Sequence, residues 1–237
     1  MAVARETPLG PGRLMQKVGA EMIGTFALVF AGCGAMMVDR ITGGTIGHAG
    51  IAFTFALVIM VMIYATGHIC GAHFIPAVTI AFAVCKRFPW RQVPAYIAGQ
   101  CVAAIAAALL LRAILGDVAH MGATAPAGSI GQSFALEVVV SFFLMFVITA
   151  VATDSRAVGA MAGWAIGGTV GLCSMFAGPI SGASMNPARS LGPALAATSF
   201  DELWLYFAAP VIGAILGAVA YQFVTCGDAD QSADGCC

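Results

Sequence analysis

Long apolar runs dominate the pattern of hydrophobic and polar positions along the chain. A bilayer core of about 30 Å takes roughly 20 apolar residues in one helix, and six runs approach or exceed that length between glycine, proline and charged residues. The runs lack the strict alternation that a membrane strand requires. The pattern therefore predicts six membrane-spanning helices, at about 18–38, 46–66, 92–115, 132–152, 158–177 and 203–224.

Two further apolar segments are too short to cross a bilayer. They cover about 76–85 and 187–196, and each opens with a proline. Proline suits the first position of a helix, because its missing N–H has no intrahelical partner there. We therefore predict two re-entrant half-helices and an all-α membrane fold.

Charged positions are too sparse for a water-soluble domain. Of 237 residues, 9% are charged and 60% are hydrophobic, whereas soluble domains carry about 25% charged residues. The net charge of −1 leaves no basic stripe for phosphates, which argues against nucleic-acid binding. The cysteine and histidine spacings do not indicate a metal site. We expect a bilayer-embedded protein without a metal or other cofactor.

Basic residues collect on one side of the predicted helices. Seven of the ten lie before the first helix or in the loops after the second and fourth: Arg5, Arg13, Lys17, Lys86, Arg87, Arg91 and Arg156. Positive loops stay in the cytoplasm, which places both termini there. The expected organisation is a cytoplasmic tail at 1–17, a membrane domain at 18–224 and a second cytoplasmic tail at 225–237.

The two halves of the membrane domain repeat each other. GHICGAHFIPA at 67–77 aligns with GPISGASMNPA at 178–188, and matching segments surround Glu21 and Glu137. Each repeat, about 18–115 and 132–224, holds three spans and one half-helix. Because three is odd, the second copy must be inverted relative to the first, and interrupted segments at matching positions indicate a transport site.

The predicted arrangement of the half-helices has an electrostatic consequence. In an inverted repeat their amino-terminal ends meet near the midplane, and each end is the positive end of a helix dipole. Cations and hydrated protons are opposed there, while neutral solutes can pass.

These paired loops resemble those of the aquaporin and glycerol-facilitator (major intrinsic protein) family. GHICGAHFIPAVTIAFA and SGASMNPARSLGPA are long, specific matches, and the likeness extends over residues 17–224. CKRFPW and VATDSRAVG are most similar to the plant nodulin-26-like branch. The resemblance implies a homotetramer in the plasma membrane with one pore per subunit. It also implies a passive, non-enzymatic channel for water and small uncharged solutes such as glycerol, urea, ammonia, and boric or arsenous acid.

The resemblance also implies a selectivity constriction. Arg189, directly after the second loop motif, would donate to solute oxygens and repel cations. The other three positions of the constriction fall on Phe55, Ser174 and Ala183. Water-selective members usually carry a histidine and a cysteine at the last two, so the smaller residues here imply a wider opening.

The first midplane motif departs from the family pattern. Asn186 can cap its half-helix and donate to passing solute, but Ile75, where the family has asparagine, can do neither. We expect slower water flux and weaker selectivity as a result. The motif residues are Ile75, Pro76, Ala77, Asn186, Pro187 and Ala188.

Glu21 and Glu137 occupy corresponding places in the first and fourth spans. Carboxylates inside a membrane are candidate functional sites. The resemblance favours a structural role in which each braces one re-entrant loop, and a proton relay in a coupled transporter is the alternative.

Other readings of the whole chain stay open at this point. A secondary transporter also uses inverted repeats and broken helices. A poorly conducting, gated or purely structural protein would result if Ile75 obstructs the pore. An intramembrane protease with Ser184 as nucleophile would lack a histidine base downstream in the sequence.

Overall fold

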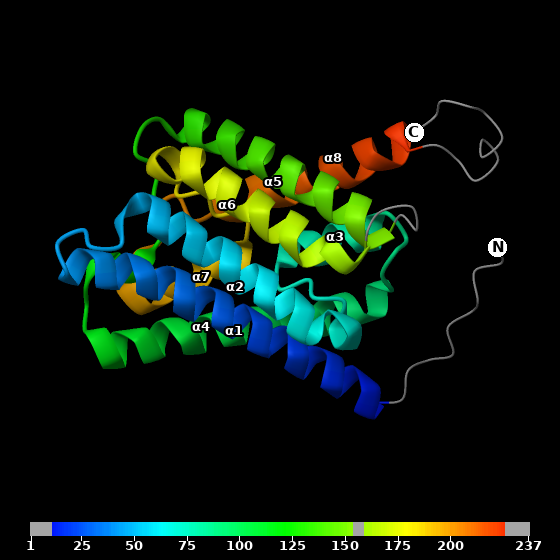
Figure 1. Ribbon diagram of the computed structural model, residues 1–237, viewed down its shortest axis with the longest axis horizontal. Helices are drawn as coiled ribbons and strands as arrows, with labels where there is room; N and C mark the ends of the chain where they lie inside the picture. Colours follow the sequence, from blue (N-terminus) through cyan, green and yellow to red (C-terminus); the bar gives the residue numbers. More distant parts are fainter. Residues whose placement is uncertain (1–10, 154–158, 226–237) are drawn as a thin grey trace.

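The computed structural model describes residues 11–153 and 159–225. Within these ranges the chain is helical and contains no strand, and six of its helices are long and apolar enough to cross a membrane. They lie alongside one another in a bundle (Figure 1). The prediction of an all-α fold with six spans is therefore confirmed. The spans are α1 (Pro11–Ile41), α2 (Gly47–Cys70), α4 (Val93–Leu115), α5 (Ile130–Thr153), α6 (Ala162–Ser181) and α8 (Leu205–Val224).

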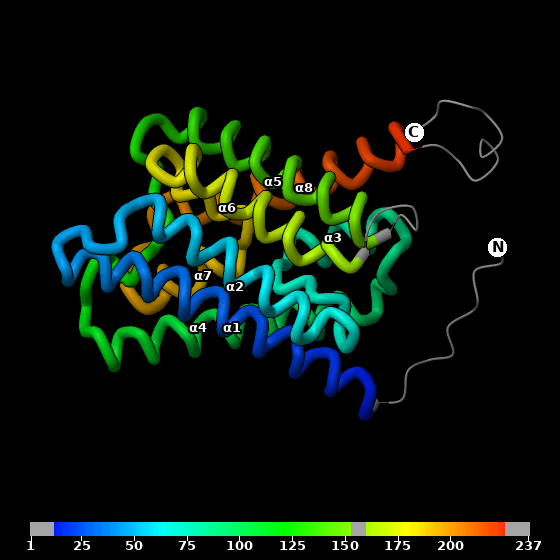
Figure 2. Tube along the Cα trace, viewed as in Figure 1, coloured from blue at the N-terminus to red at the C-terminus, as the bar shows by residue number. Residues whose placement is uncertain are grey.

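Two short helices complete the bundle, at the places where half-helices were predicted. They are α3 (Pro76–Val84) and α7 (Pro187–Ala197). In Figure 1, α3 lies in the right-hand half of the bundle and α7 in the left-hand half, so the two enter from opposite ends. The Cα trace follows both (Figure 2). Short turns lie in the connections: η1 (Trp90–Gln92), η2 (Ala119–Gly122) and η3 (Gly159–Met161). The residues of η2 all have positive φ, so this turn is left-handed.

The two repeats interlock through these half-helices. Within the first repeat α1 packs against α2 and α4, and in the second α5 packs against α6 and α8 in the same way. Each half-helix, however, packs against the last span of the other repeat: α3 on α8, and α7 on α4. The fold is therefore a single interlocked body, with the irregular loop of each repeat held inside the bundle.

Glycines allow the close helix crossings that this exchange requires. A Cβ added at Gly192 of α7 would lie 2.4 Å from the carbonyl oxygen of Ala104 in α4. A Cβ at Gly217 of α8 would lie 2.3 Å from the carbonyl oxygen of Phe142 in α5. Small residues at such crossings are the usual basis of helix packing in lipid, because burial of apolar surface contributes little driving force for helix association there.

The second and fifth spans end later than predicted. Their expected ends were 66 and 177, but α2 continues to Cys70 and α6 to Ser181. Each then stops at a glycine in the left-handed conformation, Gly71 and Gly182, both with φ of 88°. A left-handed glycine is a common helix terminator, and here it also turns the chain back into the bundle.

A proline lies inside the longer α6 without breaking it. Pro179 has no N–H to bond the carbonyl oxygen of Met175 one turn earlier. His48, at the start of α2, fills this gap with its Nε2 atom 2.7 Å from that oxygen. Membrane helices tolerate proline where a neighbouring helix satisfies the freed group.

The first helix also begins earlier than expected. It starts at Pro11, inside the segment at 1–17 that was expected to be a tail. Proline at the first helical position explains the start. Residues 1–10, 154–158 and 226–237 lie outside the described part of the chain. Arg5, Arg156 and nearly all of the predicted carboxy-terminal tail at 225–237 fall there.

The outside of the bundle is apolar. Large hydrophobic side chains are exposed along the spans, which would be unfavourable in water over so wide an area. They include Phe53, Val102, Leu109, Phe143, Trp164, Leu172, Leu216 and Phe223. Polar side chains such as Glu21 and Glu137 are instead fully buried, which is the arrangement expected of a protein whose solvent is lipid.

Candidate functional site

The loop that leads into α3 is held by the carboxylate of Glu21. Its two oxygens accept the backbone N–H groups of His73, at 2.8 Å, and Phe74, at 2.6 Å. Gln100 of α4 donates to the same carboxylate at 2.8 Å. Phe74 is in the left-handed region with φ of 54°, so this stretch makes no helical hydrogen bonds of its own. Glu21 supplies the acceptors that the irregular backbone lacks inside a membrane.

The loop that leads into α7 is held in the same manner by Glu137 of α5. This carboxylate accepts the N–H of Ser184 at 2.8 Å and that of Met185 at 2.9 Å. The hydroxyl of Ser181 donates to it at 2.7 Å. The two glutamates that correspond in the repeat thus make corresponding contacts.

A second pair of repeat-related residues ties down the ends of the spans before these loops. The hydroxyl of Tyr96 donates to the carbonyl oxygen of Cys70 at 2.9 Å, and that of Tyr206 donates to the carbonyl oxygen of Ser181 at 2.7 Å. The repeat alignment brings the two tyrosines into register, but no local pattern in the sequence indicates what they contact.

The two half-helices begin differently. Before α7, the side-chain oxygen of Asn186 accepts the N–H groups of Ala188 and Arg189, at 3.0 and 3.3 Å. Its amide nitrogen donates to the carbonyl oxygen of Phe74 at 3.3 Å, which links the two re-entrant loops. Ile75 holds the corresponding place before α3 with an extended backbone and no side-chain cap.

Arg189 is buried within the bundle although it is charged. Its Nη1 donates to the carbonyl oxygen of Gly122 in η2 at 2.8 Å, and its Cζ lies 5.2 Å from the centre of the Phe55 ring. Among the described residues no carboxylate forms an ion pair with it. A guanidinium held by a carbonyl oxygen and an aromatic face keeps a positive charge that no salt bridge neutralises among the described residues.

Phe55 reaches this position because α1 leaves room for it. A Cβ added at Gly32 would lie 2.1 Å from Cε1 of the Phe55 ring. Gly24, two turns earlier on α1, makes the same room for Phe74, with a Cβ-to-Cε1 distance of 2.0 Å. The sequence does not indicate which ring either glycine accommodates, because this contact arises only when the helices pack.

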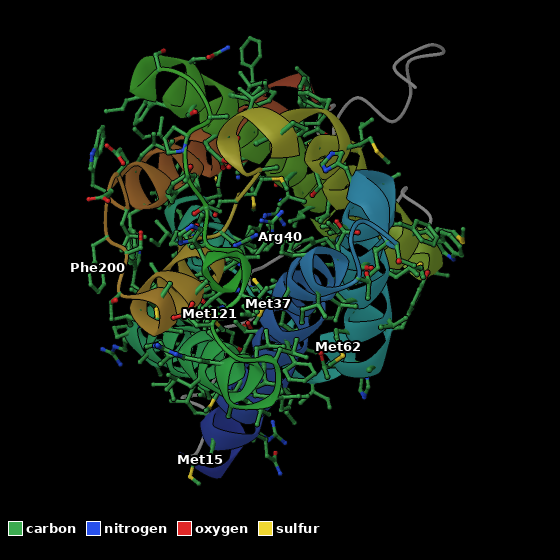
Figure 3. The ribbon with its side chains drawn as sticks, turned by 90° about the vertical axis from the view of Figure 1, so that its left-hand side faces the viewer. Met15, Met37, Arg40, Met62, Met121 and Phe200 are labelled. Carbon is green, nitrogen blue, oxygen red and sulfur yellow. The ribbon has the colours of Figure 1, made fainter. Side chains whose placement is uncertain are left out.

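Three cavities lie in series through the bundle. The cavity that we call outer is about 280 Å³ and includes His48 and Met36 in its lining. Met37 and Arg40, which neighbour Met36 on α1, are labelled in Figure 3. The middle one is about 20 Å³ and includes Asn186. The inner one is about 80 Å³ and includes His73.

Residues shared between neighbouring cavities mark two junctions. The outer and middle cavities share Phe55, Ser174, Ala183 and Arg189. The middle and inner cavities share a second, entirely apolar set: Ile59, Ile75, Leu144 and Val170. The structure thus gathers the four predicted constriction residues, which come from distant parts of the sequence, at one junction. Of the apolar set, only Ile75 was singled out from the sequence.

Comparison with known proteins decides the family. The sequence profile of the major intrinsic protein family matches residues 11–221. The chain belongs to this family. It is 53% identical to aquaporin NIP1-3 of Oryza sativa subsp. japonica, over 92% of this chain and 76% of that protein. It is 52% identical to the probable aquaporin NIP4-2 of Arabidopsis thaliana, over 89% of this chain and 75% of the relative.

A solved structure agrees on the fold. The aquaglyceroporin of Plasmodium falciparum superposes with a TM-score of 0.81 at 22% sequence identity, covering 90% of this chain and 97% of that one. The predicted family, its nodulin-26-like branch and the aquaporin-like fold are therefore confirmed.

Family membership also narrows the readings of the whole chain. Proteins of this family are channels within the membrane that pass water and small solutes, and they are not enzymes. The chain is accordingly an integral multi-pass membrane protein.

The hydroxyl of Ser184, the nucleophile of the protease alternative, lies 2.6 Å from that of Ser190 and donates to the carbonyl oxygen of Asn186 at 3.0 Å. Among the described residues, no group of three or more His, Cys, Asp and Glu side chains could hold a metal ion.

Proposed function

We propose that water and small uncharged solutes cross the membrane passively along the row of three cavities. The observation that carries this proposal is the convergence of Phe55, Ser174, Ala183 and Arg189 at the junction of the outer and middle cavities. A solute at this junction meets a donor in Arg189 and an apolar wall in Phe55. Orientation of a solute by a few polar groups in a mostly apolar passage is the general basis of selectivity in such pores.

The proposed solutes include molecules larger than water. Ser174 and Ala183 are small side chains at the junction that Phe55 and Arg189 also line. This favours glycerol, urea, ammonia, and boric or arsenous acid in addition to water. Each of these solutes offers an oxygen or nitrogen lone pair to the guanidinium. Each is also uncharged, so it crosses without the desolvation cost of an ion.

Ions and protons are excluded in this proposal by two positive features. The first is Arg189, whose charge has no carboxylate partner among the described residues. The second is the meeting of the amino-terminal ends of α3 and α7, which the bond from Asn186 to Phe74 brings together. Helix dipoles place positive potential at such ends, and both features oppose a cation in the passage.

Solute flux into proteoliposomes tests the proposal. Purified protein would be reconstituted and swelling recorded by stopped-flow light scattering with water, glycerol, urea and boric acid, against empty liposomes of the same lipid. We expect flux above the empty vesicles and no ionic current under a salt gradient. An Ala183→Trp variant should close the outer junction and serves as the blocked control. Flux no greater than in empty liposomes for every solute would overturn the proposal. Uptake that depends on an ion gradient would favour the secondary transporter instead.

We further propose a homotetramer in which α2 and α6 face neighbouring subunits. The support is a groove of about 290 Å³ between these helices on the outside of the bundle. It combines exposed Phe53, Trp164 and Leu172 with small residues that include Gly168. A Cβ at Gly168 meets nothing within 4 Å of its own subunit, so Gly168→Trp should leave the subunit folded and break the tetramer in native mass spectrometry.

The orientation is proposed from the basic residues. The start of α1 and the end of α8 lie at the same end of the bundle (Figure 1), in keeping with two cytoplasmic termini and an even number of spans. Lys86, Arg87 and Arg91, in the loop after α3, belong to the basic set that favours this side. Protease accessibility of terminal tags in intact cells would test the orientation, and surface biotinylation would test the plasma-membrane location.

A further inference from the structure

The middle cavity lies where the two repeats meet, and corresponding residues from both repeats line it. The repeat alignment pairs Leu28 with Leu144, Ile59 with Val170, and Ile75 with Asn186. The first two pairs are apolar on both sides. Only the third pair is unequal, because a polar residue in one repeat corresponds to an apolar residue in the other, and both line the same cavity.

The side chains at the junction of the middle and inner cavities are all apolar. The residues shared by the two cavities are Ile59, Ile75, Leu144 and Val170, and each is buried, with 2–5% of its surface exposed. The outer junction, in contrast, contains the hydroxyl of Ser174 and the guanidinium of Arg189. A solute that passes the inner junction therefore leaves its hydration behind without a replacement from these four side chains, as in a hydrophobic constriction.

Asn186 has little hydrogen-bonding capacity left for a solute. A side-chain amide has two donor hydrogens, and one of them is used on the carbonyl oxygen of Phe74. Its oxygen is used by the N–H groups at the start of α7. One side-chain N–H remains for the passage, and the side chain of Ile75, which corresponds to Asn186 in the repeat, offers none. The midplane therefore presents one polar edge and one apolar edge.

We infer that Ile59, Ile75, Leu144 and Val170 form a second, apolar constriction that selects among uncharged solutes. It favours solutes that have one polar edge and one apolar edge over solutes that are polar on all sides. The inference rests on the proposed channel function and names the solute class that this function prefers. Ile75 is the residue that sets the preference, because its counterpart in the second repeat is polar.

Matched pairs of solutes make the preference measurable. Acetamide and urea have the same shape, but acetamide carries a methyl group where urea carries a second amino group. Acetamide can direct its carbonyl oxygen to Asn186 and its methyl group to Ile75, whereas urea must place an amino group against an apolar wall. The difference between 1,2-propanediol and glycerol is one hydroxyl, and the same argument applies.

The test compares channel-mediated permeabilities of the full-length protein in liposomes, after subtraction of empty liposomes. The Ile75→Asn variant should lower the acetamide-to-urea ratio about fivefold, since it adds about one hydrogen bond at the midplane. The 1,2-propanediol-to-glycerol ratio should fall with it. The matched control is Ile75→Val, which keeps the wall apolar and should leave both ratios within about twofold of the wild-type values.

A second variant separates solute selection from effects on folding. Val170→Thr keeps the shape of the side chain, adds a hydroxyl to the same constriction and has no part in capping a half-helix. It should lower both ratios in the same direction as Ile75→Asn. Wild-type flux with ratios that stay unchanged in both variants overturns this inference and leaves the proposed function standing. Absence of wild-type flux for every solute overturns both.

Discussion

The side-chain amide of Asn186 donates to the carbonyl oxygen of Phe74 at 3.3 Å, so one re-entrant loop holds the other at the centre of the bundle. The hydroxyl of Thr25 donates to the same oxygen at 3.1 Å. The reciprocal side-chain bond, from the residue that precedes α3, cannot form because the side chain of Ile75 has no donor. The two half-helices correspond in the repeat, but the residue before α7 makes side-chain hydrogen bonds that the residue before α3 does not. Substitution of Ile75 can test the effect of this difference.

Ile75→Asn should make the midplane more symmetric and raise water permeability per channel. The new side chain can cap α3, which contributes about 1 kcal/mol of stability, and can offer a second donor to water. The measurement is stopped-flow water permeability divided by the number of reconstituted channels, together with thermal unfolding in detergent. Ile75→Val provides the comparison, since it neither caps nor donates. Equal water permeability per channel in Ile75→Asn and wild type would contradict the expectation.

Gly32→Ala should narrow the outer constriction. The new methyl group would lie 2.1 Å from the Phe55 ring, so the ring must move away from α1, toward the passage that it lines. We expect glycerol permeability to fall more than water permeability, because the larger solute needs the lost width. Gly19→Ala is the control on the same helix, where an added Cβ meets nothing within 4 Å. A glycerol-to-water ratio equal to that of the control would show that Gly32 does not position Phe55.

Glu137→Gln should destabilise the protein, and solute flux should be independent of a proton gradient both before and after the substitution. The carboxylate oxygens accept the N–H groups of Ser184 and Met185, one each, and the substitution replaces one of these oxygens with an amide NH₂ group. A buried donor left facing another donor costs about 1–3 kcal/mol, which thermal unfolding in detergent would register. Solute flux through the wild type and the surviving variant should be insensitive to an imposed proton gradient. Wild-type flux that follows the gradient, and loses this dependence in Glu137→Gln, would restore the proton-relay alternative.

Gly192→Ala should loosen the contact between α7 and α4. Its methyl group would meet the carbonyl oxygen of Ala104 at 2.4 Å, and a backbone atom cannot swing aside as a flexible side chain can. Overpacking of this kind costs about 1–3 kcal/mol. The variant should unfold at lower temperature than Gly19→Ala, which faces open space. Equal unfolding temperatures would mean that α7 shifts on α4 without cost.

Much of the architecture follows from the sequence because few backbone arrangements are stable in a lipid bilayer. Run length fixes the number of spans, and prolines at the start of two short apolar runs indicate the half-helices. The repeat alone pairs Glu21 with Glu137. Phe55, Ser174 and Ala183, however, were named only through the family resemblance, since no local pattern links residues from distant segments.

Other features could not be read from the sequence because they are tertiary. Gly67 and Gly178 lie inside helices while Gly71 and Gly182 end them, and composition does not distinguish the two kinds of glycine. The role of Gly32 depends on the ring that packs against it from α2. The apolar set at the inner junction needed the packed structure in the same way.

His48 and Pro179 should be energetically coupled across α2 and α6. Pro179 cannot donate to the carbonyl oxygen of Met175, and His48 occupies that oxygen instead, at 2.7 Å. In the wild-type background, His48→Ala removes this partner and should cost about 1 kcal/mol. In a Pro179→Ala background, the alanine N–H can bond Met175 within the helix, so the same His48→Ala change should cost much less. A double-mutant cycle by thermal unfolding measures the difference. If His48→Ala had the same effect in both backgrounds, the contact would contribute nothing to tolerance of the proline, and α6 would have to accommodate Pro179 by its packing alone.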